Sequence, residues 1–148
     1  MIFNEAVETD VPGLVALINS AYRSPGAVAG WTHERGLLEG PRADRQAILT
    51  ALSNGRMKVV RPSSGTDPVA CIHIALDEDL GWYLSLLAVV PEQQGKGVGG
   101  ALLEEVAKQA AIAGVRHLRM AVIKQRRDLI AWYEARGFRS TGETVPFP

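Results

Sequence analysis

The sequence has little of several features that would each indicate a particular class of protein. It holds one cysteine, Cys71, among 148 residues, so no disulfide can form within the chain and a zinc site built on several thiolates is excluded. It has no run of 18 apolar residues, and its first residues lack the basic start and apolar stretch of a secretory signal. We therefore expect a cytoplasmic, reduced protein that does not enter a membrane.

Neither sign of charge is in excess. Lys and Arg total 16, Asp and Glu total 16, and the formal net charge is +0. Proteins that bind nucleic acid or anionic membranes draw much of their affinity from an excess of cations, so neither partner is expected. The three histidines, His33, His73 and His117, are far apart in the sequence and predict no metal site.

The composition is that of an ordinary globular protein, with 47% hydrophobic and 22% charged residues. A chain of this length is the usual size of one domain and can bury a sizeable core. No internal repeat and no linker divides it. We therefore expect a single domain over residues 1–148.

Apolar periodicity predicts a mixed order of strands and helices. Strands joined by short turns pair antiparallel, whereas strand 82–90 reaches strand 117–123 through a helix, which predicts a parallel, right-handed crossover. The expected fold class is α/β (α+β), a mixed, mostly antiparallel sheet flanked by helices. Expected strands are 2–6, 57–61, 69–76, 82–90, 117–123 and 138–143; expected helices end near 22 and cover 43–52, 100–113 and 127–136.

A glycine-rich turn, residues 94–100, lies between strand 82–90 and the next helix. The first N–H groups of a helix have no partner inside the helix, and the helix dipole adds partial positive charge there. Glycines let a bulky anion approach the backbone. The turn therefore predicts a phosphate or pyrophosphate site, with Lys96 adding a positive charge at its rim.

Other interpretations of this turn fit the sequence less well. A P-loop needs Ser or Thr after Gly-Lys, but Gly97 follows Lys96. The spacing Gly95-x-Gly97-x-x-Gly100 matches the dinucleotide fingerprint, yet strand 117–123 lacks the acidic residue that binds the ribose, and only 48 residues follow Gly100. A turn without any ligand would rarely need four glycines among six residues, given their large unfolded-state entropy.

Two segments resemble motifs of the GNAT superfamily of acetyltransferases. Residues 87–99, LAVVPEQQGKGVG, resemble its main motif Gln/Arg-x-x-Gly-x-Gly/Ala, with Gln94, Gly97 and Gly99 at the matching positions. Residues 131–138, AWYEARGF, resemble its aromatic-Tyr-Glu-x-x-Gly-Phe segment. The resemblance covers one whole domain. It implies an enzyme that moves an acetyl group from acetyl-CoA, without a metal, to a primary amine of a small molecule or peptide.

The resemblance also implies roles for single residues. In the family a β-bulge splays the strand before the turn from the next strand, and the cofactor lies in the gap, held by backbone hydrogen bonds. A backbone N–H such as that of Leu87 would stabilise the oxyanion. Tyr133 matches the tyrosine that protonates the leaving sulfur, and the alternative is a tyrosine that only covers the core. The implied cofactor-binding residues are Leu87, Ala88, Val89, Gln94, Gly95, Lys96, Gly97, Val98, Gly99 and Gly100, with Arg126 either at the phosphates or facing solvent.

The general base is left open. Some members carry a glutamate at the position of Ala121, which cannot accept a proton, and many carry asparagine at the position of Arg126. The remaining candidates for the base are Glu34, the three carboxylates at 77–79, and water.

The acceptor site is expected between the first two helices, in the region that commonly shapes it in the family. Trp31 and Glu34 are the candidates there: Glu34 could bind or deprotonate an ammonium, or it could simply begin a helix while Trp31 is buried. Because no base is assigned, a non-catalytic CoA-binding sensor stays the alternative to an enzyme. The sequence leaves a homodimer open.

Overall fold

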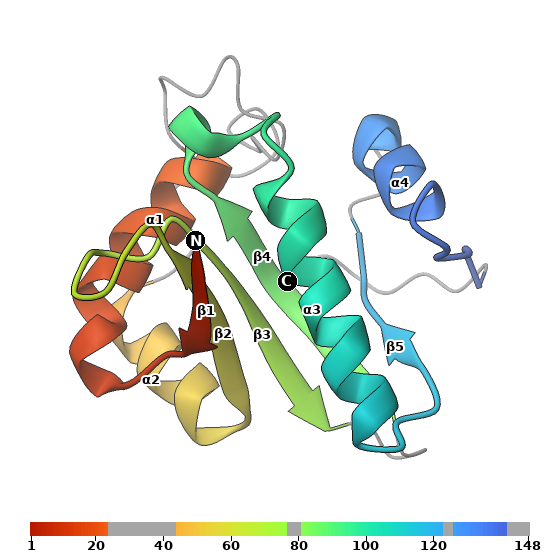
Figure 1. Cartoon of the computed structure of the whole chain (residues 1–148), viewed down its shortest axis with the longest axis horizontal. Helices are drawn as coiled ribbons and strands as arrows, with labels where there is room; N and C mark the ends of the chain where they lie inside the picture. Colours follow the sequence, from red (N-terminus) through yellow and green to blue (C-terminus); the bar gives the residue numbers. More distant parts are fainter. Residues whose placement is uncertain (24–43, 77–80, 123–125, 142–148) are drawn as a thin grey trace.

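A mixed sheet forms the centre of the protein (Figure 1). The computed structural model describes residues 1–23, 44–76, 81–122 and 126–141. Within them the sheet has five strands in chain order, the first four antiparallel and the fifth parallel to the fourth. This confirms the expected sheet. The strands are β1 (Ile2–Glu5), β2 (Arg56–Arg61), β3 (Ala70–Leu76), β4 (Trp82–Val89) and β5 (Leu118–Arg119).

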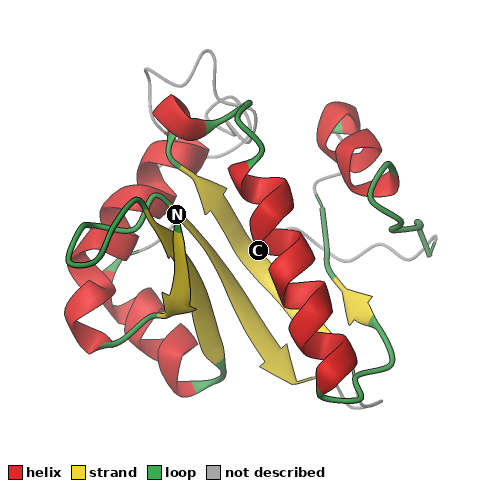
Figure 2. Cartoon of the chain, in the orientation of Figure 1, coloured by secondary structure: helices red, strands yellow, loops and turns green. Residues whose placement is uncertain are grey.

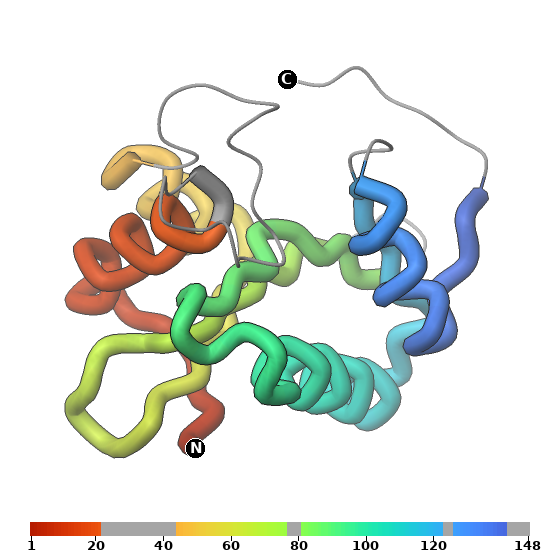
Figure 3. Tube along the Cα trace, turned by 90° about the horizontal axis from the view of Figure 1, so that it is seen from above, coloured from red at the N-terminus to blue at the C-terminus, as the bar shows by residue number. Residues whose placement is uncertain are grey.

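Helices cover both faces of the sheet (Figures 2 and 3). On one face α1 (Val11–Arg23) and α2 (Arg45–Ser53) bury a cluster that includes Cys71, and on the other α3 (Val98–Ile112) and α4 (Arg127–Glu134) bury one that includes Ile72. Successive residues of β3 thus serve opposite cores, as the alternation of side chains along a strand requires. Among the helices of the described residues, none combines the length and the apolar composition that a membrane span requires.

Polar contacts fix the ends of the helices on the α1–α2 face. The Asp44 carboxylate accepts a hydrogen bond from the Ala47 N–H (2.8 Å) and caps the start of α2. His73 Nε2 donates to the Ala51 carbonyl (2.7 Å), which ties the end of α2 to β3. The short 3-10 helix η1 (Glu8–Asp10) precedes α1, and Asp10 pairs with Arg61 of β2 at 2.7 Å.

Several expected boundaries were wrong, including those of α2, which begins at Arg45, and of α4, which ends at Glu134. Helix α3 begins at Val98, two residues early, because Gly97 is its left-handed N-cap. The expected strand 117–123 shrinks to the two residues of β5, since a strand extends only as far as its neighbour pairs with it. Residues 138–141 belong to no strand, and the rest of the expected strand 138–143 lies outside the described residues.

Candidate functional site

A β-bulge interrupts β4 just before the glycine turn. Between the register pairs Cys71–Ala88 and His73–Ser85, β4 carries one more residue than β3. Leu86 lies at the bulge with a φ of 54°, in the left-handed region that residues with side chains rarely adopt. Its carbonyl accepts a hydrogen bond from the Cys71 thiol (Sγ to O, 3.4 Å). Apart from the family resemblance, no feature of the sequence indicated this bulge.

Strands β4 and β5 separate beyond their first residues. Within the described residues they are paired only at Trp82–Leu118 and Tyr83–Arg119, and in Figure 1 β4 runs behind α3 whereas β5 lies to the right of that helix. The expected splayed pair is therefore present. The segment Leu87–Val89, implied to bind the pantetheine arm, follows the bulge on the side where β4 has left β5.

Two left-handed glycines carry the chain from β4 into α3. After the 3-10 helix η3 (Pro91–Gln93), Gly95 and Gly97 have φ values of 79° and 81°. Apart from the adjoining residues, no atom of the described residues lies within 4 Å of the position that a Cβ would take at either glycine. Backbone conformation, and not close packing, therefore requires glycine here. Gln94 Nε2 donates to the Val89 carbonyl (2.8 Å) and ties the turn to the end of the strand.

The first turn of α3 offers a set of donors for an anion. The first hydrogen bond of the helix runs from the Ala101 N–H to the Gly97 carbonyl (2.9 Å). The N–H groups of Val98, Gly99 and Gly100 come before it, and a 15-residue helix adds its dipole at this end. Lys96 is exposed beside them. This donor set fits a pyrophosphate, as expected from the turn.

Tyr133 is buried beside these elements. It is 8% exposed and belongs to the same core cluster as Leu87, Val89 and Val98. Burial raises the pKa of its phenol above the ordinary value of 10.0, so the side chain carries its proton throughout the neutral range. It packs edge-on against Trp132, with the ring centroids 5.0 Å apart. Tyr133 thus shares a core cluster with two residues of the proposed cofactor strand, and its role as the general acid stays a prediction.

Other expected site residues have different surroundings. Arg126 makes a two-pronged ion pair with Asp128 (Nε to Oδ1 and Nη2 to Oδ2, both 3.1 Å), which lowers the pKa of that carboxyl. The candidates Trp31 and Glu34, and the carboxylates at 77–79, lie outside the described residues. Among the residues that the structure does describe, no three His, Cys, Asp or Glu side chains gather as a metal site would require.

Sequence reasoning missed the contact of α4 with the first turn of α3. A Cβ on Gly99 would lie 3.8 Å from the Trp132 ring, and one on Gly100 would lie 3.3 Å from Nε and Nη2 of Arg136. The Arg136 guanidinium stacks on the Trp132 ring, 3.8 Å from its centroid. The i, i+4 spacing of Trp132 and Arg136 could have indicated a shared helix face, but not which element it meets.

The family model described as the acetyltransferase (GNAT) family matches residues 18–138. The chain belongs to this family. It is accordingly an acyltransferase, and the GNAT resemblance found in the sequence is confirmed. A search of curated protein sequences found no match.

Solved GNAT structures share the fold over nearly the whole chain. The ribosomal-protein-S18-alanine N-acetyltransferase of Escherichia coli is 20% identical with a TM-score of 0.73, over 93% of this chain and 77% of that one. The ribosomal-protein-alanine N-acetyltransferase of Brucella melitensis is 23% identical with a TM-score of 0.71, over 96% and 86%. A Trypanosoma brucei acetyltransferase is 14% identical with a TM-score of 0.68, over 99% and 98%.

Proposed function

We propose that this GNAT acyltransferase moves an acetyl group from acetyl-CoA to a primary amine of a small molecule or peptide. The observation that carries the proposal is the glycine turn 94–100 at the mouth of the splayed β4–β5 pair. The N–H groups of the turn and of the first turn of α3 hold the pyrophosphate. The pantetheine arm then follows Leu87–Val89 along β4. Two structural neighbours that are named alanine N-acetyltransferases support a peptide amine as one class of acceptor.

The chemistry asks three things of the protein. Acetyl-CoA supplies a thioester, whose carbonyl carbon forms a bond with the nitrogen of a neutral amine while the carbon–sulfur bond breaks. Backbone N–H groups of β4 stabilise the oxyanion that develops in between. Tyr133 gives its proton to the departing sulfur, and the nitrogen loses a proton to a base or to water. Protein contacts thus stabilise charge at both the oxygen and the sulfur.

A CoA-binding module without catalysis is the second candidate. The residue that favours it is Ala121, which has no proton acceptor at a position where some members carry glutamate. The buried, protonated Tyr133 favours the enzyme. The two candidates share the cofactor site and differ only in turnover.

Ligand binding followed by an amine assay tests the proposal. Thermal-shift measurements should show stabilisation by acetyl-CoA and CoA, about 2.7 kcal/mol at 100 times the dissociation constant, and little by NAD or ATP. Equal stabilisation by NAD would contradict the proposed cofactor. Release of free thiol that depends on an added amine would then support the enzyme, whereas CoA binding without any such release would support the non-catalytic module.

A further inference from the structure

Arg136, in the turn that follows α4, brings a second set of anion donors to the glycine turn. Its Nη1 donates to the Trp132 carbonyl (3.0 Å), and its Cζ atom lies over the Trp132 ring, 3.8 Å from the ring centroid. These two contacts hold the guanidinium in one orientation. The other edge, formed by Nε and Nη2, lies against Gly100 in the first turn of α3.

That edge is the one through which arginine binds carboxylates and phosphates with two parallel hydrogen bonds. Arg126 in the same chain uses this edge for a carboxylate, because its Nε and Nη2 both donate to Asp128. Arg136 has no ion pair within the part of the chain that the structure describes. Of the two arginines, Arg136 is therefore the one whose fork is directed at the proposed phosphate site.

The position is electrostatically unfavourable without a ligand. The start of a helix carries partial positive charge, so a cation beside the first turn of α3 is repelled, whereas an anion between the two is attracted by both. Gly100 allows the approach, since a side chain there would press on the guanidinium. The reason for glycine thus differs at the two positions: Gly100 leaves space for the guanidinium, whereas Gly97 is needed for a backbone φ of 81°.

We infer that Arg136 is a phosphate-binding residue of this enzyme, and that its Nε–Nη2 edge and the first N–H groups of α3 together bind the pyrophosphate of the CoA substrate. The inference rests on the proposed use of acetyl-CoA. Trp132 acts as the positioning residue for the guanidinium, and Gly100 provides the space. Arg126, the cation that the sequence suggested for the phosphates, already has its carboxylate partner.

Binding measurements with CoA and with 3′-dephospho-CoA test this assignment. Both ligands carry the pyrophosphate, and only CoA carries the 3′-phosphate. Arg136→Ala should weaken both about ten-fold, which corresponds to about 1.4 kcal/mol. Arg136→Lys should recover part of the loss, because an ammonium keeps the charge but not the fork. Arg45→Ala, which removes an exposed arginine at the start of α2, should leave both affinities unchanged.

Gly100→Ala provides an independent variant that removes no donor. Its methyl group displaces the guanidinium, so CoA affinity should fall several-fold, while the helix gains a residue of higher propensity. In the Arg136→Ala background the same substitution should have no further effect. Additive losses would mean that the methyl group meets the ligand itself, which would contradict the assigned role of Gly100.

Two outcomes would overturn the inference. Unchanged affinity of Arg136→Ala for both ligands would remove Arg136 from the site. A loss seen with CoA but not with 3′-dephospho-CoA would place Arg136 at the 3′-phosphate and refute the pyrophosphate contact. Failure of the unmodified protein to bind either ligand is a different result, because it would refute the proposed function and not the role of one residue.

Discussion

Tyr133 carries the chemical part of the proposal, because it is a protonated side chain in the same core cluster as Leu87 and Val89 of the cofactor strand. Its phenol is buried against Trp132 and Phe138, and burial raises its pKa. A donor of this kind keeps its proton when the solution pH approaches 10. Deprotonation of Tyr133 should therefore not limit the rate below that pH.

Tyr133→Phe keeps the packed ring and removes the proton. We expect kcat to fall by a factor of about 100 or more, the usual contribution of a general acid, with little change in CoA affinity. Steady-state kinetics and calorimetric titration with CoA give the two quantities. An unchanged kcat would show that the sulfur takes its proton from elsewhere, and an unchanged melting temperature would verify that the variant is folded.

Cys71 is a buried thiol whose ionisation is linked to folding. Burial raises its pKa from 9.0 to about 12. The unfolded chain ionises this thiol at its ordinary pKa, whereas the native protein keeps it protonated. Stability is therefore complete below pH 9 and is lost as the pH rises towards 12, by about 1.4 kcal/mol for each pH unit.

Cys71→Ala should remove this part of the alkaline instability. Between pH 8.5 and pH 10 the free energy of unfolding should fall about 1 kcal/mol more in the unmodified protein than in the variant. Urea unfolding at the two pH values measures the difference. The comparison of slopes is insensitive to the packing that the variant also loses at neutral pH. Identical slopes would mean that the thiol is not protected by burial.

At the scale of one element, the proposed binding of the pyrophosphate depends on the backbone conformation of the turn into α3. Gly97 and Gly65 form a matched pair, because both have a φ of 81°. At both, the space that a Cβ would take is clear to 4 Å of every described residue other than the adjoining ones. They differ in place: Gly97 is the N-cap of α3, and Gly65 lies in the turn between β2 and β3.

Alanine at either glycine should lower the free energy of unfolding by about 1–2 kcal/mol, the cost of a left-handed residue with a side chain. Only Gly97→Ala should also weaken CoA binding, because relief of that strain turns the N–H groups away from the pyrophosphate. Thermal melts and CoA titrations of the two variants separate these effects. Equal CoA affinity in both would contradict the placement of the phosphates at this turn.

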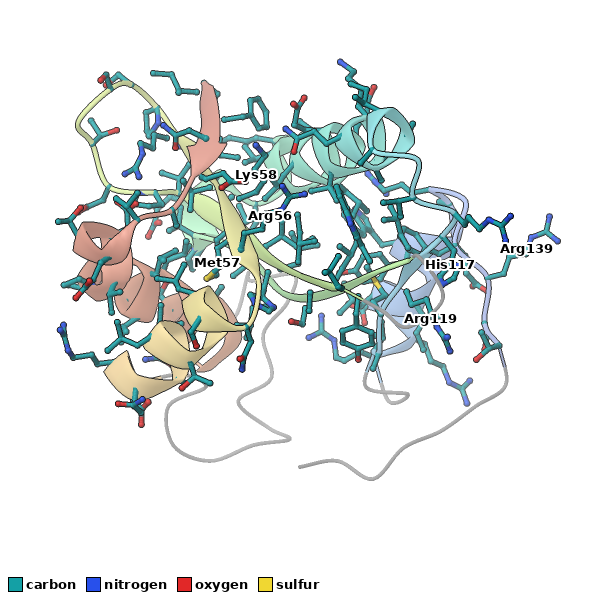
Figure 4. The ribbon with its side chains drawn as sticks, turned by 90° about the horizontal axis from the view of Figure 1, so that it is seen from below. Arg56, Met57, Lys58, His117, Arg119 and Arg139 are labelled. Atoms are coloured by element: carbon teal, nitrogen blue, oxygen red, sulfur yellow. The ribbon has the colours of Figure 1, made fainter. Side chains whose placement is uncertain are left out.

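At the scale of the whole molecule, the short β4–β5 pairing connects the antiparallel part of the sheet to the part formed by α3, β5 and α4. The Trp82 N–H donates to the His117 carbonyl (3.0 Å) beside the two register pairs. His117 lies next to β5 and across the molecule from β2, whose Arg56, Met57 and Lys58 are labelled in Figure 4. The His117 ring occupies the space that a side chain on Gly81 would need.

Gly81→Ala should therefore strain the packing beside the β4–β5 pairing, because the added methyl group meets the His117 ring. We expect a loss of about 2 kcal/mol in the free energy of unfolding, typical of overpacking. His117→Ala in the same chain should make room for the added methyl group, so the double variant should be more stable than the sum of the single losses implies. Denaturant unfolding of all four proteins gives the coupling. Strictly additive losses would show that Gly81 and His117 do not compete for space.

Much of the candidate site could be predicted because it depends on neighbours along the chain. The glycine turn, the helix that follows it and the Tyr133 segment are each specified by residues within about ten positions. The conformation of glycine and the free N–H groups of a helix start are local properties. The residues of the acceptor site proposed at Trp31 and Glu34 stay predictions.

What the sequence determined by itself was the order of elements, the position of the turn and the family. Tertiary structure alone decided three features: the left-handed backbone of Leu86, whose carbonyl accepts from the Cys71 thiol, the two-residue length of β5, and the approach of Arg136 to Gly100. The reason is that strand pairing and contacts between helices depend on partners far along the chain. Local preference can place a residue on a helix face, but only packing decides which element that face meets.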